Sequence, residues 1–599
     1  MSPDHSPLEQ IHEVIQTHNP FRRELTVRQQ EVWGTGFPDV PSINAHASDA
    51  VFEAIENVRS GSRQVMGITL LADPGGGKTH LISRIRHRLQ ANGGAWFIYM
   101  DQYANLNQIS LEFLKTLATS LKKTGSKNVM QWQELAANLV NHAEAEQDRP
   151  EEIVEKVQSL ENPAAYIEAL TDCILDLHPD IENPDLVKAI LWTLSKNKHY
   201  AINWLSGRSL AQNRAEQMQL ANPSEEQREN EIFEMSCQIL DLVSYYNPLV
   251  ICFDRFDSQE VNDAGYTRLQ VVADFCMDLY DKLKKGVLIT AVYPEIWITQ
   301  LKAMTNPKAI EDRIAERKID LDVLDGDSAF NLIGTYLSEF YQQKNLTPPH
   351  PVYPFDRDRL IELGKQKAIA RNILKWCRDN WSLPNADSGS QDREPQQNPV
   401  ESALNNEIEQ VEADSLLDNE AKIAKSLRFC FERLVGFHLE NVTIKEIEKV
   451  NPPNKYVDFK IVGEENGQMV KIGIAVLQAS GGTTVTAGLS HLGNYQKYDL
   501  TRGCLVRSKE VSPNARRARE YLNRLLQEQG GEWVTLKFEE IKPLVAIAEV
   551  YDGREDYGLS DAQIFDYIAE TKFVETNPLI LEILSDPSGQ IPDDVEEDN

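Results

Sequence analysis

The amino-acid sequence predicts an α/β protein, in which a mostly parallel sheet with a phosphate-binding loop precedes a second, smaller α/β domain. Apolar runs of strand length at 65–71, 95–101, 248–254 and 286–292 alternate with longer stretches of helical periodicity. A glycine-rich loop directly follows the first run. A polar stretch at 384–399 has no large apolar side chain, and it separates these elements from further helices and strands. Strands that alternate with helices are typical of a parallel sheet.

The elements of the first domain follow one another from a polar N-terminal segment. A helix is expected at about 47–58, before the first strand. After the second strand, leucines at three- and four-residue spacing continue without a strand signal, which predicts a long helical insertion. The sheet then resumes and ends near 319–321, and helices follow. These expectations give an N-terminal segment at 1–45, a core at 46–318 with the insertion at about 104–246, and a helical lid at 319–382.

The glycine-rich loop at 72–79 reads ADPGGGKT and lies between a strand and a helix. Glycines in this setting let backbone N–H groups turn toward phosphate oxygens, and the helix that follows points its positive end at the same phosphates. Lys78 supplies a cation to the β- and γ-phosphates, and the Thr79 hydroxyl can hold Mg²⁺. The alternative is a glycine-rich turn with a chance Lys-Thr pair. We expect ATP and Mg²⁺ as cofactors, with nucleotide contacts from Asp73, Pro74, Gly75, Gly76, Gly77, Lys78, Thr79 and His80.

Three polar residues near strand ends are candidates for the hydrolytic step. Asp254 ends an apolar strand and is expected to orient the metal ion, although an ordinary acid at a strand end is the alternative. Arg255 stands where hydrolysing proteins usually have a glutamate that activates water, so turnover is expected to be slow unless Asp257 or another group supplies the base. Thr290 is expected to end the next strand, where it could position water near the γ-phosphate or lie there by chance.

Three arginines are candidates for phosphate contacts from outside the loop. Arg313 or Arg317 could reach a neighbouring subunit as an arginine finger, with a salt bridge on the helix surface as the alternative for each. Arg371 begins an apolar helix that would pack beside the nucleotide.

These stretches together resemble the AAA+ and STAND-type P-loop ATPases, especially those of replication-initiator type and the ATP-binding proteins of prokaryotic phage-defence islands. The resemblance covers about 15–382 and implies an ATPase that oligomerises around nucleotide. It also implies that Arg371 contacts the γ-phosphate. Ala72, Arg255 and Ala370 depart from the pattern, which leaves ATP binding expected and efficient hydrolysis open. The residues that carry the resemblance lie at 19–21, 72–79, 204–208, 249–254, 290 and 370–374.

A second domain is expected at 418–575, after a linker at 383–417 and before an acidic tail at 576–599. The order of its elements is helix, strand, strand, helix, strand, which resembles the restriction-endonuclease-like core. Active members of that family hold Mg²⁺ with an acid on the first strand and an acid-x-lysine on the second. Asp458 matches the first acid, but the second strand offers Gln478 and Ser480, so nuclease activity is not expected. A generic α/β accessory domain is the alternative.

The net charge of −31 argues against broad affinity for nucleic acid, because phosphates repel an acidic surface. One local exception lies between 497 and 524, where eight basic and three acidic residues give a balance of +5. A solvated helix face is the alternative explanation of this stretch. The nucleic-acid candidates are Arg507, Arg516, Arg517, Arg519 and Arg524.

Composition adds expectations about location and partners. No apolar run reaches about 18 residues, so no membrane span is expected, and the first residues show no secretion signal. Seven scattered cysteines without a C-x-x-C pair suggest reduced thiols in a cytoplasmic protein.

Two functions from different classes fit these observations. The first is an ATP-dependent, oligomeric molecular switch that acts on DNA or with a DNA-processing protein partner. Family resemblance alone suggests phage defence or a mobile element as its setting. The alternative is a STAND-like signalling scaffold that binds ATP and protein partners without nucleic acid. An ATP-gated nuclease is disfavoured by the missing acid-x-lysine.

Overall fold

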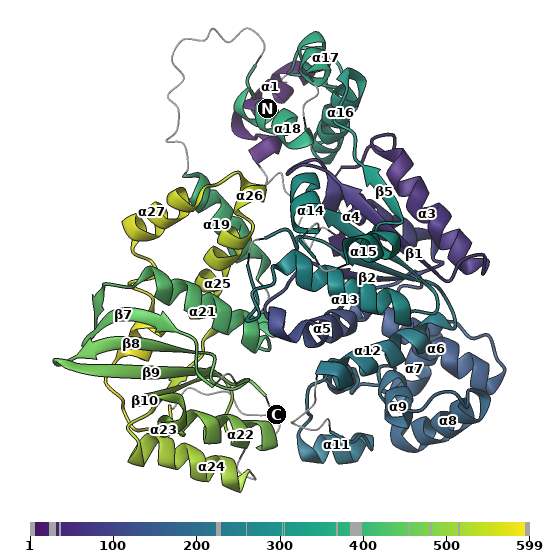
Figure 1. The fold of residues 1–599 in the computed structure, drawn as a ribbon. Helices are drawn as coiled ribbons and strands as arrows, with labels where there is room; N and C mark the ends of the chain where they lie inside the picture. Colours follow the sequence, from purple (N-terminus) through teal and green to yellow (C-terminus); the bar gives the residue numbers. More distant parts are fainter. Residues whose placement is uncertain are drawn as a thin grey trace, which may run out of the picture. The chain divides into compact units, whose positions relative to one another are not determined.

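The computed structural model describes most of the chain and divides it into two compact units (Figure 1). The first unit comprises Met1–Leu160, Asp172–Glu182 and Ile232–Gln396. The second comprises Glu161–Thr171, Asn183–Glu231 and Gln397–Asn599, so part of the expected insertion is grouped with the C-terminal residues. The described residues are 6–22, 32–34, 38–222, 229–258, 260–301, 303–304, 306–366, 369–383, 398–411, 413–452, 454–479, 482–512 and 515–592.

The first unit contains a five-stranded sheet in the order β2-β3-β4-β1-β5, and every neighbouring pair in it is parallel. This confirms the expected α/β class with its parallel sheet. The inner strands are almost wholly apolar because helices cover both faces. Their carboxyl ends meet at one edge, where the phosphate-binding loop also lies. The strands are β1 (Val65–Leu71), β2 (Trp96–Met100), β3 (Leu249–Phe253), β4 (Gly286–Val292) and β5 (Arg317–Asp320).

Helices surround this sheet and fill the long connection between β2 and β3. At Gly67, an added Cβ would lie 1.9 Å from the carbonyl oxygen of Arg313, so α15 (Pro307–Ile314) packs with its backbone against β1. The connection is helical, as expected. Its members are α5 (Ile109–Lys122), α6 (Gln131–Glu144), α7 (Pro150–Ser159), α8 (Pro163–Leu177), α9 (Pro184–Trp192), α10 (Lys198–Leu205), α11 (Gln212–Met218) and α12 (Glu229–Ser244). The other helices beside the sheet are α3 (Ala45–Arg59), α4 (Lys78–Asn92), α13 (Arg268–Lys282) and α14 (Pro294–Leu301).

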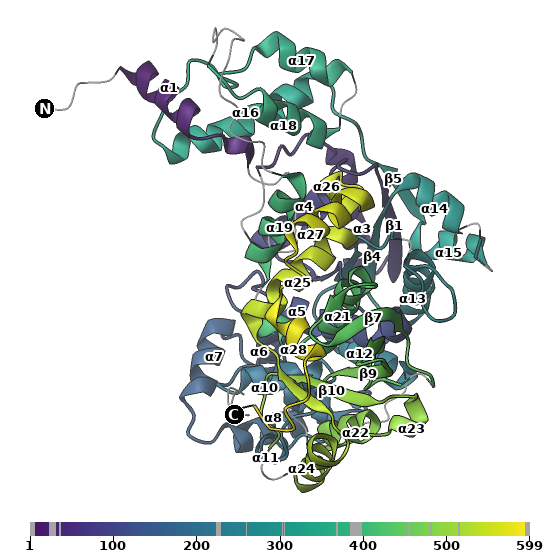
Figure 2. The same ribbon diagram turned by 90° about the vertical axis from the view of Figure 1, so that its left-hand side faces the viewer.

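The lid helices form a core of their own, and the N-terminal segment is part of it (Figure 2). Phe21 is fully buried and packs against the rings of Tyr336, Phe355 and Trp381. Asn19 donates to the carbonyl oxygen of Arg378 at 3.0 Å. The motif at 19–21 therefore ties the start of the chain to the lid. The helices that share this core are α1 (Pro7–Thr17), α16 (Gly326–Gln343), α17 (Arg357–Lys365) and α18 (Ala370–Asp379).

The second unit is built on a six-stranded sheet in the order β11-β10-β9-β8-β7-β6. Strands β7 to β9 are antiparallel, whereas β9, β10 and β11 are parallel. Helices α21 and α25 lie on one side of it, and α22 and α24 lie on the other (Figure 1). The bounds are α21 (Glu420–Arg433), β6 (His438–Leu439), β7 (Val442–Glu448), β8 (Phe459–Glu465), β9 (Gln468–Val476), α22 (Gly482–Leu492), β10 (Arg502–Arg507), α24 (Arg516–Asn523), β11 (Glu532–Thr535) and α25 (Phe538–Asp552).

The structure differs from the expected C-terminal organisation in its strands, its linker and its tail. Strands β6, β7 and β11 were not predicted. In β7 only two of the seven residues are buried, and its apolar pattern is weak. The expected linker contains α19 (Pro399–Gln410), whose Val400 and Leu404 are buried in the C-terminal core, while 384–397 lie outside the described residues. The expected tail begins with α28 (Pro578–Leu584), which also packs into that core. None of the described helices is long and apolar enough to cross a membrane.

Candidate nucleotide-binding site

The loop between β1 and α4 has the backbone form that its glycines permit. Gly75 has φ +80° and Gly77 has φ +96°, a region that side chains with a Cβ rarely adopt. The N–H of Gly76 donates to the carbonyl oxygen of Asp73 at 2.9 Å, which closes the turn. A Cβ at Gly76 would lie 2.9 Å from the Cβ of Ala72, so the small side chain at position 72 is accommodated only because residue 76 is glycine.

Lys78 opens α4, and its ammonium group lies against the loop itself. Its Nζ donates to the carbonyl oxygen of Ala72 at 2.8 Å and lies 3.9 Å from the centre of the Tyr293 ring. Tyr293 was not among the predicted site residues. The signal that could have identified it is its position directly after the β4 strand, at the edge of the sheet where the loop lies.

Thr79 and Asp254 meet at this edge. The Thr79 hydroxyl donates to Oδ2 of Asp254 at 2.6 Å, and the Tyr99 hydroxyl donates to the same oxygen at 3.1 Å. The backbone N–H of Arg255 donates to Oδ1 of Asp254 at 3.0 Å. Burial and the charge of Asp254 raise the pKa of Tyr99 well above its usual value, so Tyr99 stays a donor. Mg²⁺ in phosphate sites takes one or two protein oxygens besides phosphates and water, and the Thr79–Asp254 pair fits that requirement.

The two residues considered for water activation have different surroundings. Arg255 has φ +57°, a left-handed backbone conformation that is uncommon for a non-glycine residue. Asp257 is 7% exposed, and its Oδ2 accepts the backbone N–H of Tyr293 at 3.2 Å. Asp257 is therefore tied to the same residue whose ring lies under the Lys78 ammonium.

Thr290 does not occupy the predicted position. It lies two residues before the end of β4 and is fully buried, and its hydroxyl pairs with that of Thr69 at 2.8 Å. Thr69 in turn donates to the carbonyl oxygen of Ile314. The expectation that Thr290 ends the strand and positions water is wrong, because the apolar run continues to Val292 and turns this hydroxyl into the core.

Arg371 lies at the phosphate-binding loop although almost 300 residues separate the two in sequence. A Cβ added to Gly75 would be 2.9 Å from Cβ of Arg371 and 3.1 Å from its Nε. The helix α18 thus begins directly beside the loop. Glycine at position 75 is required both by its φ angle and by this close approach.

An acid upstream of the loop holds the first turns of α4. His80 bonds to Asp39 at 2.9 Å, and Arg84 makes three hydrogen bonds to the same carboxylate. Burial raises the pKa of Asp39, but the bonds from His80 and Arg84 and their charges outweigh this and lower it to about 2. The His80 side chain, predicted to contact nucleotide, is thus engaged by Asp39, a residue that the sequence did not single out.

The arginine-finger candidates make salt bridges within their own chain. Arg313 pairs with Asp281 at 2.7 Å, and Arg317 pairs with Glu53 at 2.7 Å. Both are partly exposed surface pairs, which is the alternative considered for each residue.

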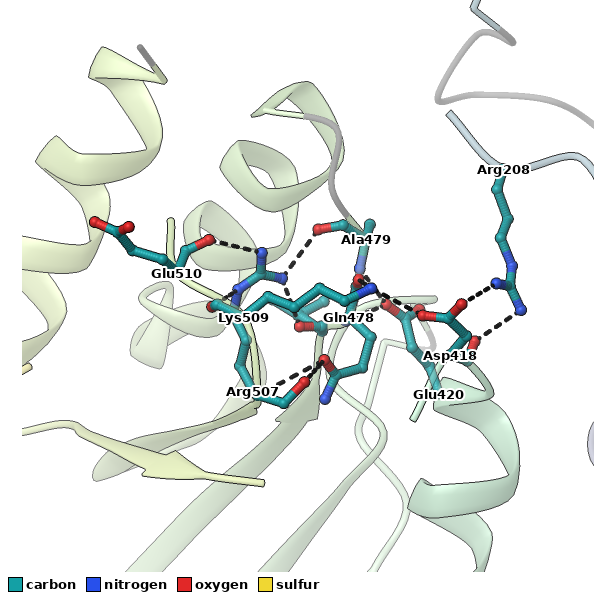
Figure 3. Close-up of polar contacts among 10 residues, drawn as sticks. Arg208, Asp418, Glu420, Gln478, Ala479, Arg507, Lys509 and Glu510 are labelled. Atoms are coloured by element: carbon teal, nitrogen blue, oxygen red, sulfur yellow. Dashed lines mark hydrogen bonds and ion pairs between the residues drawn. The ribbon is translucent and has the colours of Figure 1, made fainter. Parts of the chain in front are cut away.

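The basic stretch of the second unit separates into a buried and an exposed part. Arg507 is fully buried, and its guanidinium donates to the carbonyl oxygens of Leu477, Ala479, Lys509 and Glu510 (Figure 3). The prediction that Arg507 contacts nucleic acid is therefore wrong, because its donors hold the protein's own backbone. The remaining candidates are exposed on α24 and just after it: Arg516, Arg517, Arg519 and Arg524.

A polar network surrounds the position at which active nucleases of the restriction-endonuclease type have the acid-x-lysine. Asp418 accepts from Arg208 and Lys509 at 2.8 Å each, and Glu420 accepts the backbone N–H groups of Gln478 and Ala479 (Figure 3). Asp458 precedes β8 and accepts the N–H of Val476. Within the described residues, no three His, Cys, Asp or Glu side chains are placed to hold a metal ion.

The comparisons with known proteins give little beyond these residues. No protein-family model matches this chain, and no curated protein matches it. A solved structure described as the crystal structure of Cdc6p from Pyrobaculum aerophilum is similar, with 10% sequence identity and a TM-score of 0.31. The similarity covers 68% of this chain and 79% of that chain. A likeness of this degree carries no functional inference, so function is inferred from the site: a phosphate-binding loop on a parallel sheet of an α/β protein.

Proposed function

We propose that this protein is an ATP-binding molecular switch of AAA+ type that hydrolyses ATP. The observation that supports this most directly is the convergence of Lys78, Thr79, Asp254 and Arg371 on one loop. Each has a separate task. Lys78 and the loop N–H groups bind the β- and γ-phosphates, and Arg371 reaches the γ-phosphate from the lid.

Thr79 and Asp254 would hold Mg²⁺, which supplies positive charge to the phosphates when bound. Their direct hydrogen bond of 2.6 Å shows that the hydroxyl and carboxylate oxygens already lie together. Tyr99 and the N–H of Arg255 fix the carboxylate, so it needs no reorientation before the ion arrives.

Asp257 is the residue that we assign to orient the attacking water. Its bond to the N–H of Tyr293 places it at the carboxyl edge of β4, and Tyr293 also contacts Lys78. Arg255 cannot accept a proton, since a guanidinium remains protonated. Turnover is therefore expected to be slow.

ATP turnover by the purified full chain tests this proposal, with Lys78→Ala as the blank. Asp257→Asn should abolish turnover while leaving ATP affinity within a few-fold, and Arg255→Glu should leave turnover unchanged or raise it. Tight ATP binding without turnover, with or without duplex DNA, would contradict hydrolysis and favour a signalling scaffold.

We further propose that the switch acts on DNA or with a DNA-processing partner, as an oligomer, in a setting such as phage defence. The exposed arginines of α24 support a DNA contact, because three of them occur within four residues. Oligomerisation would bring Arg313 or Arg317 to a neighbouring nucleotide.

A DNA-binding titration with a matched control separates this from general electrostatics. Replacing Arg516, Arg517 and Arg519 by alanine should weaken duplex binding and reduce the salt slope by roughly one for each phosphate that is no longer neutralised. The control replaces Arg59, Arg149 and Arg357, which are also exposed, and it changes net charge by the same amount. Equal weakening by both triple variants would refute a specific α24 contact.

A further inference from the structure

A polar cavity lies beside α4 at a distance from the phosphate-binding loop. It is bounded by Trp33, by Arg86 and Gln90 of α4, by the start of β2, and by the wall at 124–126 with Glu134 behind it. The space between its lining atoms, counted together with the gaps between them and the open solvent at its mouth, is about 370 Å³. Arg86 follows Lys78 by eight residues, or about 12 Å along the helix, so this cavity is separate from the nucleotide site.

Arg86 is a buried cation whose charge the described residues do not balance. It is 4% exposed, yet no described carboxylate lies within ion-pair distance of it, and its buried Nη1 makes no hydrogen bond. Its guanidinium instead faces the ring of Trp33, 5.4 Å away. Arg84, two residues earlier on the same helix, shows the contrast, since Asp39 meets its guanidinium at several atoms.

Burying a guanidinium without a counter-charge is strongly unfavourable, because the charge loses its hydration. The same desolvation lowers the pKa of Arg86 to about 10. The side chain nevertheless remains charged at neutral pH, and it lines a cavity rather than packed core. This combination is expected where a negatively charged group from outside completes the site.

Glu134 on the facing wall does not serve as that group. Its carboxylate accepts the backbone N–H of Lys127, and it lies directly on Gly125, where an added Cβ would be 2.4 Å from its Oε1. Burial raises the pKa of Glu134 to about 7, against the bond from Lys127. Glu134 is thus committed to its own loop, and it is only partly ionised near neutral pH.

We propose that this cavity binds a small oxyanion, the phosphate or carboxylate group of a ligand, with Arg86 as its counter-ion. Trp33 holds the Arg86 guanidinium by a cation–π contact, while the hydrogen-bond donors of Arg86 face the ligand. A planar fork of donors suits both kinds of oxyanion, so the same recognition chemistry serves either one.

Thermal unfolding of the full chain with inorganic phosphate or acetate tests this proposal. Saturating ADP and Mg²⁺ keep the phosphate-binding loop occupied, and Lys78→Ala repeats the test with that loop disabled. We expect one of the two anions to raise the midpoint of the wild-type protein and of Lys78→Ala by roughly 3 °C at about ten times its Kd. A phosphate response without an acetate response identifies a phosphate site, and the reverse identifies a carboxylate site.

The matched pair of variants is Arg86→Met and Arg88→Met. Arg88 lies on the same helix but is half-exposed, pairs with Asp49 and stacks on Phe52. Arg86→Met should lose the anion-dependent shift, while Arg88→Met should retain it. If Arg86→Met does not fold, hydrogen exchange of the 83–92 peptide in the wild-type protein, with and without the anion, gives the same answer. An equal shift in both variants, or no anion-dependent protection of that peptide, would overturn the proposal.

Discussion

Alanine at Gly75 probes the approach of the lid to the phosphate-binding loop. With φ +80°, an L-residue at this position costs about 1–2 kcal/mol. The added Cβ would also lie 2.9 Å from Cβ of Arg371, so α18 or the loop must shift, at a further cost of roughly 1–3 kcal/mol. We therefore expect Gly75→Ala to lower the free energy of unfolding of the nucleotide-free protein by about 2–5 kcal/mol.

Gly77→Ala is the matched control, because it carries the backbone strain without the collision. Gly77 has φ +96°, and no described atom other than its chain neighbours lies within 4 Å of an added Cβ. Its expected loss is about 1–2 kcal/mol. Urea titration followed by hydrogen exchange of peptides from α4 and α18 measures both losses. Equal losses in the two variants would refute the packing of Arg371 on the loop.

Individual side chains give four further predictions. Thr290→Val should leave ATP turnover unchanged and cost about 1 kcal/mol of stability for the lost bond to Thr69; reduced turnover in this variant would restore a role near the phosphate. Asp39→Asn should cost roughly 1–2 kcal/mol at pH 7. Because the pKa of Asp39 is lowered to about 2 in the folded protein, the difference in free energy of unfolding between the wild-type protein and Asp39→Asn, measured by urea titration, should shrink as pH falls below 4. Burial raises the pKa of Glu134 in the folded protein to about 7, so the free energy of unfolding of the wild-type protein rises as pH falls from 7 toward 4.5. The stability of Glu134→Gln relative to the wild-type protein should therefore increase by roughly 2–3 kcal/mol as pH is raised from 5 to 8. A stability difference that does not change with pH would contradict this. Arg507→Met should lower the free energy of unfolding of the second unit by about 3–5 kcal/mol, because it leaves buried carbonyl oxygens without a hydrogen-bond donor. A loss of DNA affinity without a loss of stability would instead indicate that Arg507 contacts DNA.

The residues that the sequence identified best are those whose chemistry is local. The loop at 72–79 needs only contiguous residues, since its backbone, Lys78 and Thr79 act together wherever a strand passes into a helix. Asp254 follows from the same reasoning, because the end of a buried strand in a parallel sheet lies at the loop edge. The strands of the first sheet could likewise be predicted from the sequence, because they are short apolar runs bounded by polar residues.

Charge counted along the chain was a weaker guide, as Arg507 shows. Arg507 ends β10, a strand in which every residue is buried, so its position already argued against exposure. A count of basic residues does not distinguish a side chain inside a sheet from one on a helix face. The exposed arginines of α24 differ only because Ala518 and Leu522 turn the opposite face of that helix inward.

What the sequence by itself determined is the class of fold and the phosphate-binding loop, because both depend on patterns within a few neighbouring residues. The tertiary structure alone decided which distant residues complete the site. Tyr293 and Arg371 reach the loop from separate elements, and Asp39 holds the first turns of the helix that follows it. Thr290 turns away from the loop into the core. Their roles depend on strand order and helix packing, which bring together side chains that no local pattern relates.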